Sequence, residues 1–461
     1  MGDGRVFRRS LAADPPVAVR AAGARIQDAA GREYVDAAGG AIVVGIGHGR
    51  TSVARIMAEQ AERLAYVHGS AFTTEPLEAY VRAIGPHLPL ADPALYPVSG
   101  GSEAIETALK MVRAYHLARD EPDRLIVVAR WGSYHGNTLG ALDLSGRQPL
   151  RRPYEGWLGR FRHASAAYPY RSGEPEAHAL GTTEALAAEL EAMFARAEPG
   201  TIAAFVAEPI VGATLGVVEP PSGYWPAIVE VCRRHGALVV ADEVMTGFGR
   251  TGRWFASEAV GLRPDILVAA KGASSGYVPF GFAASSGAVH ATILEGGFTH
   301  GFTFSHHPLG AAVAGEVLRI LEAERLVEAS ERLGAMLLAA LAARFASHPH
   351  VGEVRGRGLF AALELVADRE SRASFPRAAR LAEGVAAAAR ERGLLVYPAS
   401  GHANGTDGDL ILLGPPFVIT EAELGLIVER LAAALEDALP AALAALDPAR
   451  LTPSRTRSAP G

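Results

Sequence analysis

The chain has 461 residues, of which 49% are hydrophobic and 20% are charged, and its formal net charge is −6. This composition is typical of a globular protein with a large buried core, and it lacks the basic surplus of a protein that binds nucleic acid. The single cysteine, Cys232, excludes an intrachain disulfide. With no secretory signal and no apolar run of membrane-spanning length, we expect a cytoplasmic protein without a membrane partner.

The N-terminal region alternates short strands, loops and helices. Its sequence predicts two strands that meet at a turn near Gly31, followed by an apolar stretch at 41–44 and a glycine-rich loop. Helical spacing of apolar residues runs from Ser52 to Leu64. A second helix is expected after Thr74.

The segment SGGSEAIETALK, residues 99–110, predicts a strand, a glycine turn and a helix. Gly100, Gly101 and Ser102 lie where that helix begins. Free backbone N–H groups and the positive end of the helix dipole favour a phosphate at such a place. A serine that only caps the helix is the alternative.

Two further strands lead into polar segments. The run RLIVVARW is followed by Tyr134 and His135, and the run TIAAFVA is followed by Glu208. Because the carboxyl ends of parallel strands meet at one edge of a sheet, we expect Glu208 to face a crevice there. Between the two strands, three arginines cluster near aromatic residues. Such a cluster is usually a solvated loop, but one of its arginines could bind a substrate carboxylate. These arginines are Arg147, Arg151 and Arg152.

Two apolar runs between residues 237 and 275 each end in one ionisable residue, ALVVA in Asp242 and ILVAA in Lys271. Among 44 lysines and arginines, only Lys110 and Lys271 are lysines. An arginine stays protonated, whereas a desolvated lysine becomes a neutral amine that attacks carbonyl groups. A lysine that snorkels to solvent is the alternative for Lys271. Lys110 follows Glu106 by four residues, which is the spacing of a surface ion pair.

A lysine amine that faces a buried carboxylate is the pair that pyridoxal phosphate needs. Lys271 would form a Schiff base with the cofactor's aldehyde. Asp242 would keep the pyridine nitrogen protonated, so that the ring accepts electrons. An aspartate that only caps the turn after its strand is the alternative for Asp242.

The same region contains the spacing G-x-G-x-x-G at Gly247, Gly249 and Gly252. In a dinucleotide-binding fold this motif opens a helix directly. The following residues RWFASE give no helix start at the last glycine. We therefore interpret these glycines as a tight active-site loop.

From about residue 311 the sequence alternates long Ala/Leu/Glu/Arg helices with strand-like runs, which predicts a compact C-terminal α/β domain. The residues after Pro440 are rich in proline, serine and arginine and predict a frayed tail.

Six segments in a fixed order resemble the class III (ornithine or omega type) aminotransferases of fold type I. They are SGGSEAIETALK, SYHGNTLGAL, AEPI, DEVMTGFGRTG, DILVAAKG and HGFTFSHHPLG. The resemblance runs from about Arg25 to about Leu424. It implies an α/β fold with a large, mostly parallel-sheet domain and a smaller α/β domain from both chain ends. Residues 1–60 and 316–440 would form the small domain, 61–315 the large cofactor-binding domain, and 441–461 a flexible tail.

The resemblance also implies roles for individual residues. Gly101 and Ser102 would hold the cofactor phosphate, and Tyr134 would stack on the pyridine ring. Thr303 would reach across a homodimer to the phosphate in the other subunit's site. The whole expected cofactor set is Gly101, Ser102, Tyr134, His135, Glu208, Asp242, Val244, Lys271 and Thr303, with Lys271 and Asp242 as the catalytic pair and no metal.

The chain departs from the family pattern at three positions. In ornithine-type relatives the residue matching Glu208 pairs with an arginine before a double proline, but the matching residue here is Leu412. Met245 stands where those relatives often have a glutamine, and His306 where many have a glycine. Without a fixed arginine at 412, an α-carboxylate must be bound by another cation or by a mobile arginine, as in omega-transaminases, which favours an omega-type enzyme over a strict ornithine or acetylornithine enzyme.

These observations predict a pyridoxal-phosphate-dependent aminotransferase. It would move an amino group from an amine or amino acid to a 2-oxo acid. An aminomutase or decarboxylase of the same fold is the alternative, and a non-catalytic binding protein is a remote one.

Overall fold

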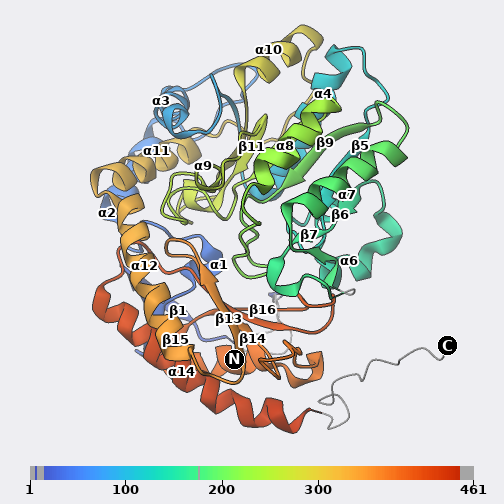
Figure 1. Cartoon of the computed structure of the whole chain (residues 1–461). Helices are drawn as coiled ribbons and strands as arrows, with labels where there is room; N and C mark the ends of the chain where they lie inside the picture. The colour runs from blue at the N-terminus through green and yellow to red at the C-terminus, as the bar shows by residue number, and fades with distance from the viewer. Residues whose placement is uncertain (1–5, 8–14, 175–176, 447–461) are drawn as a thin grey trace, which may run out of the picture.

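The computed structural model describes residues 6–7, 15–174 and 177–446. A seven-stranded sheet forms the centre of its larger part (Figure 1). Its middle strands are parallel, and only β12 runs antiparallel to both of its neighbours. In spatial order the strands are β4 (Ala94–Val98), β12 (Gly281–Ser285), β11 (Ile266–Ala269), β10 (Leu238–Asp242), β9 (Ile202–Ala207), β5 (Ile126–Arg130) and β6 (Arg162–Ala164).

Both faces of this sheet are covered by helices, which explains the apolar runs of its strands. On β10, Leu238 and Val240 pack in the same cluster as α4 (Gly101–Ala118). The alternate residues Val239 and Ala241 pack with α7 (Thr183–Arg196) and α8 (Tyr224–Arg234). Cys232 on α8 is fully buried in this second cluster, as expected for a packing residue.

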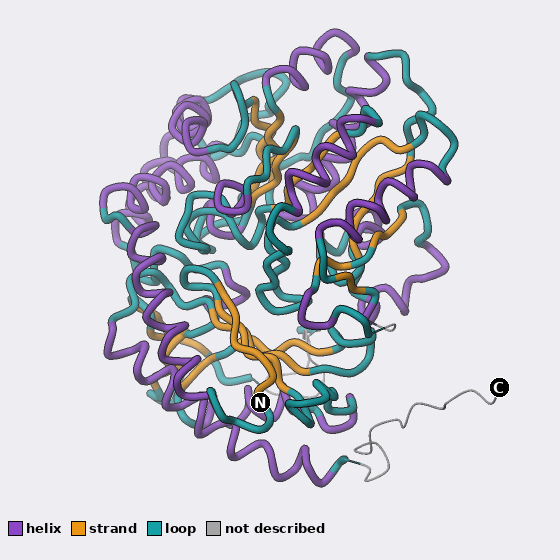
Figure 2. Tube along the Cα trace, viewed as in Figure 1, coloured by secondary structure: helices purple, strands orange, loops and turns teal. Residues whose placement is uncertain are grey.

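The smaller part contains an antiparallel sheet of four strands (Figures 1 and 2). Its strands, in spatial order, are β13 (Val351–Gly356), β14 (Ala361–Leu365), β17 (Asp409–Leu413) and β16 (Tyr397–Ser400). Two helices pack on it, α12 (Leu326–Phe345) and α13 (Leu381–Glu391), and α14 (Glu421–Ala444) packs against both of these helices. α14 continues through Pro440, so its last four residues are helical where a tail was expected.

The N-terminal strands join this smaller part. β1 (Ala18–Ala22), β2 (Arg25–Asp28) and β3 (Glu33–Asp36) form a sheet that β15 (Leu394–Leu395) completes by parallel pairing with β3. The turn at Gly31 lies between β2 and β3, as predicted, whereas β1 was not foreseen. The expected fold, a large mostly parallel sheet with a smaller α/β part from both chain ends, is therefore confirmed.

The remaining elements connect and cover these sheets. The helices are α1 (Gly39–Ile42), α2 (Thr51–Arg63), α3 (Glu75–Ile84), α5 (Leu139–Leu144), α6 (Gln148–Arg151), α9 (Ala256–Val260), α10 (Gly287–Gly296) and α11 (Pro308–Ala323). The strands are β7 (Ala166–Ala167) and β8 (Ala179–Leu180). α2 and α3 begin within a residue of the predicted starts. No helix in the described ranges is both long and apolar enough to cross a membrane.

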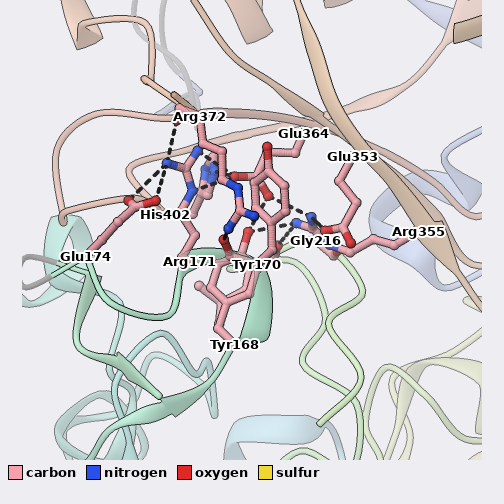
Figure 3. A network of polar contacts seen from close by, with 11 residues as sticks. Tyr168, Tyr170, Arg171, Glu174, Gly216, Glu353, Arg355, Glu364, Arg372 and His402 are labelled. Atoms are coloured by element: carbon pink, nitrogen blue, oxygen red, sulfur yellow. Dashed lines mark hydrogen bonds and ion pairs between the residues drawn. The ribbon is translucent and has the colours of Figure 1, made fainter. Parts of the chain in front are cut away.

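A buried polar cluster joins the smaller sheet to the rest of the chain (Figure 3). Glu364 on β14 is fully buried and accepts hydrogen bonds from Arg171, Arg355, His402 and Tyr168. Burial acts to raise the pKa of Glu364, but the charges of Arg355 and Arg171 and the hydrogen bond with His402 hold that pKa well below its usual value. Arg355 also donates to the backbone carbonyls of residues 215 and 216. The cluster therefore holds the loop that follows β9.

Candidate active site

A cavity of about 410 Å³ lies where the carboxyl ends of β9, β10 and β11 meet. Eight of the nine residues expected at the cofactor line it: Gly101, Ser102, Tyr134, His135, Glu208, Asp242, Val244 and Lys271. Val43, from the apolar stretch 41–44, lines it as well. The strand-end residues therefore meet in one crevice, as the sequence predicted.

Asp242 is held in a fixed orientation at the end of β10. Its side chain is almost fully buried, and its Oδ2 lies 2.7 Å from Nδ1 of His135. Its Oδ1 accepts a hydrogen bond of 3.0 Å from the backbone N–H of Val244. Nε2 of His135 is buried and has no hydrogen-bond partner among the described residues. A histidine that donates from Nδ1 to the carboxylate fits this arrangement and leaves Nε2 as an acceptor.

Lys271 begins a short 3₁₀ turn directly after β11. Its φ of 41° lies in the left-handed region, which is uncommon for residues other than glycine. Such conformations cost roughly 1–3 kcal/mol and cluster at functional sites. The next residue must be small, because a Cβ on Gly272 would lie 2.8 Å from Cβ of Phe248. The fold thus keeps Lys271 in a strained turn at the cavity.

Lys110, the other lysine, does not form the expected ion pair with Glu106. Its Nζ lies 3.3 Å from Nδ1 of His300. Glu106 instead accepts hydrogen bonds from the Thr138 hydroxyl and the Ala141 backbone N–H. The i, i+4 spacing was correct, but the chain after Tyr134 folds back over α4 and offers Glu106 nearer donors.

The amino end of α4 faces the same cavity. The N-cap is Gly100, so Ser102 lies in the first turn and does not cap the helix. The Ser102 hydroxyl accepts a hydrogen bond of 3.1 Å from the backbone N–H of Asn137. A Cβ on Gly101 would lie 3.0 Å from Cγ1 of Val244, so glycine leaves room between helix and strand end. The first N–H groups of a helix have no partner within the helix and suit an anion.

Glu208 is bound by the protein backbone. The N–H of Tyr134 donates to its Oε1 at 3.0 Å, and the N–H of Gly212 donates to its Oε2 at 2.7 Å. Burial raises the pKa of Glu208, although the neighbouring His135 and these two N–H groups oppose the effect. Leu412 is fully buried in an apolar cluster that also contains Ala213. The glutamate therefore fixes the loop of Tyr134 to that of Gly212.

One expectation differs from the structure. The glycine loop at 247–252 does not line the cavity; it carries Arg250 toward the smaller part of the molecule, where the guanidinium donates to backbone carbonyls. Thr303 lies outside the cavity and borders a separate hollow of about 480 Å³, together with Tyr96, His300 and His306. Its expected role in another subunit's site stays a prediction.

Part of the cavity wall was missed from the sequence. Val278, Pro279 and Phe280 line it after the lysine turn, and Ala213 lines it from the loop after β9. These side chains are apolar, and nothing distinguishes them in the sequence from ordinary core residues. These residues line the cavity because the fold brings their loops together, and the sequence alone does not show this.

Comparisons with known proteins agree with this geometry. The sequence model of the family described as Aminotransferase class-III matches residues 10–435. The aminotransferase YodT of Bacillus subtilis is 38% identical over 91% of this chain and 94% of its own length. The putrescine–pyruvate aminotransferase of Pseudomonas aeruginosa is 34% identical over 93% of this chain and 92% of its own. A thermostable (S)-enantioselective omega-transaminase from Thermomicrobium roseum has a similar structure, with a TM-score of 0.84 and 40% identity, covering 92% of this chain and 93% of its own.

Proposed function

Because the chain belongs to the class-III aminotransferase family, we propose that the cavity at β9, β10 and β11 is its active site and that Lys271 carries the reactive amine. The enzyme is a transaminase that moves an amino group from an amine or amino acid to a 2-oxo acid. Class III enzymes depend on pyridoxal phosphate. We propose that this chain binds that cofactor in this cavity.

The residues around the cavity fit pyridoxal phosphate. The amino end of α4, with the space left by Gly101, suits the phosphate. Asp242 suits the pyridine nitrogen, because both of its oxygens are fixed and the carboxylate is shielded from water. Tyr134 lines the cavity between these two ends and offers an aromatic face. When bound, the cofactor supplies a carbonyl carbon for amines and a ring that accepts electrons.

The protein's own part in the reaction is to orient groups and to move a proton. His135 keeps Asp242 in place through the contact between its Nδ1 and Oδ2 of the carboxylate. As general base, Nζ of Lys271 would take the proton from the substrate carbon that bears the amino group, and as general acid it would pass that proton to the carbon that carried the cofactor's aldehyde. The apolar wall of Val43, Val278 and Phe280 excludes water from that carbon.

The observation that carries the proposal is that Lys271 and Asp242 line one cavity with the amino end of α4. The test is to incubate the purified enzyme with an amine donor and pyruvate and to measure both products. Putrescine is the first donor to try, because the Pseudomonas relative is named for it. We expect alanine and the oxidised donor in equal amounts over many turnovers, and without pyruvate no alanine and at most one equivalent of oxidised donor per active site. Isomerisation or loss of CO₂ from a single substrate would instead support the aminomutase or decarboxylase.

We further propose a cytoplasmic homodimer with shared active sites. The single, buried cysteine is compatible with a reducing compartment. Thr303 lies away from the cavity of its own subunit, as a residue that serves a partner's site would.

A further inference from the structure

Arg147 differs from its neighbours in the arginine cluster because its guanidinium has no hydrogen-bond or ion-pair partner within the part of the chain that the structure describes. Arg151 donates to three backbone carbonyls and to Asp143, and Arg152 donates to the Thr406 hydroxyl. Among the described residues, no hydrogen bond or ion pair involves the side chain of Arg147. Its Nε is buried and unsatisfied.

The surroundings of Arg147 place it beside the active-site cavity. The phenol groups of Tyr397 and Tyr134 are near enough to raise its pKa, against a larger lowering by burial. Tyr134 lines the active-site cavity. Arg147 also borders a small hollow of about 30 Å³ with Thr214 and Leu215, the two residues that follow Ala213 of the cavity wall.

A half-buried guanidinium whose Nε is buried and unpaired calls for an anion. Arginine keeps its charge in proteins, and removing it from water without a counter-charge destabilises the fold. No carboxylate is among the groups that influence its pKa. Glu208, an acid of the cavity wall, already accepts from two backbone N–H groups. The planar fork of an arginine matches a carboxylate.

The cation that ornithine-type relatives place before the double proline is replaced here by a leucine. Leu412 on β17 pairs in register with Tyr397 on β16, so this stretch of sheet presents an apolar residue next to a phenol. The cation near the phenol of Tyr397 is instead Arg147, which belongs to the larger part of the molecule.

We propose that Arg147 binds the carboxylate of the 2-oxo acid acceptor on the Tyr134 and Tyr397 side of the active site. This inference rests on the proposed function and makes Arg147 a determinant of acceptor specificity. An amine without a carboxylate does not need this contact. The enzyme therefore uses Arg147 in the half of the reaction that consumes the oxo acid, and in the other half only when the donor is an amino acid.

The test compares Arg147→Gln with Arg152→Gln, a matched change at an exposed arginine of the same cluster. Two acceptors of similar size are used, pyruvate and propanal, which lacks the carboxylate. We expect Arg147→Gln to lower the preference for pyruvate over propanal in kcat/KM by about 10- to 100-fold, the range of a hydrogen bond to a charged group. Arg152→Gln should keep the wild-type preference. Binding of the unreactive anion propionate, measured by calorimetry, should weaken only in Arg147→Gln.

The donor half-reaction distinguishes a failure of the proposed function from a failure of the inference about Arg147. If the wild type fails to take an amino group from putrescine or any other amine, the proposed function itself fails. If that half-reaction is intact in Arg147→Gln and the preference for pyruvate is unchanged, the inference about Arg147 is overturned. Should the glutamine variant not fold, Arg147→Lys, which keeps the charge and loses the fork, is expected to give a partial loss of preference, and an unchanged preference would again overturn it.

Discussion

At the residue scale, the charge of Asp242 is the first feature to test after Lys271. Asp242→Asn keeps the size of the side chain and an oxygen for His135 but removes the charge that favours a protonated pyridine nitrogen. We expect kcat to fall by about 100- to 1,000-fold, as when one preorganised electrostatic group is removed. Asp265→Asn is the control, because that carboxylate accepts from the Val239 N–H and does not line the cavity. Equal losses in both variants would show that the effect is structural.

His163 predicts how stability depends on pH. Burial, reinforced by the charge of Arg151, lowers the pKa of His163 to about 4, against about 6.5 in an unfolded chain. Between these values the unfolded state binds the proton and the folded state does not, so stability falls as the pH drops from 6.5 to 4.

His163→Gln should weaken that dependence, because glutamine has no proton to bind and its amide N–H can still donate to the Leu144 carbonyl that Nε2 of His163 contacts. Thermal melts at several pH values measure this. A wild type and a variant that lose Tm in parallel over the window would contradict the assignment to His163.

At the residue scale, the sequence predicted some residues of the site and not others. Asp242 and Lys271 were found because each ends an apolar run, and strand ends meet at one sheet edge. The family resemblance placed His135 in the expected cofactor set, but its contact with Asp242 was not foreseen. The isolation of Arg147 could not be seen, because it depends on which groups the fold brings near, and its neighbours Arg151 and Arg152 look the same in the sequence.

At the element scale, the loop at 247–252 joins three parts of the chain through one arginine. Arg250 donates to the carbonyls of Leu359 and Pro415 at 2.9 and 2.7 Å and to that of Val44 at 3.0 Å. Its guanidinium also lies 4.6 Å from the ring centroid of Phe417.

Arg250→Met would leave these buried carbonyls without donors. We expect a loss of about 3 kcal/mol or more in the free energy of unfolding, measured in urea. Arg253→Met, at the residue directly after this loop, removes a half-exposed ion pair with Glu331 and should cost less than about 1 kcal/mol. Similar losses in both variants would show that Arg250 does not hold these segments together.

The prediction that this loop lies at the active site was wrong because it was based on local glycine spacing alone. The three glycines suggested a loop at the active site, but their use is set by carbonyls that lie more than 100 residues away along the chain. By contrast, the central strands were predictable, because both faces are buried and each run is almost wholly apolar. β1 was missed because its sequence AVRAA has neither alternation nor a β-branched run.

At the scale of the whole molecule, the expected role of Thr303 predicts that each active site contains residues from two chains. If its hydroxyl donates to the phosphate in the partner's site, Thr303→Ala should weaken cofactor binding by roughly tenfold or more, the value of a hydrogen bond to a charged group. Lys271→Ala should abolish transamination in its own site.

Mixed dimers of these two variants separate shared sites from separate ones. In a shared arrangement, one site of the mixed dimer carries both changes and the other carries neither. Co-expression and tandem-tag purification should therefore give a dimer with half the wild-type number of sites and wild-type cofactor affinity. A mixed dimer whose only active site has the weak affinity of Thr303→Ala would show that Thr303 serves its own subunit.

The central claim, that Lys271 is the amine through which this enzyme works, is tested most directly by visible absorption. Purified wild-type enzyme loaded with pyridoxal phosphate is titrated with amines in the absence of an acceptor, beside Lys271→Ala. We predict a cofactor band in the wild type that bleaches with a subset of amines and returns on addition of pyruvate. Lys271→Ala should lack the lysine-linked band. A wild type that never shows the band, or a Lys271→Ala variant that shows it and turns over like the wild type, would contradict the account.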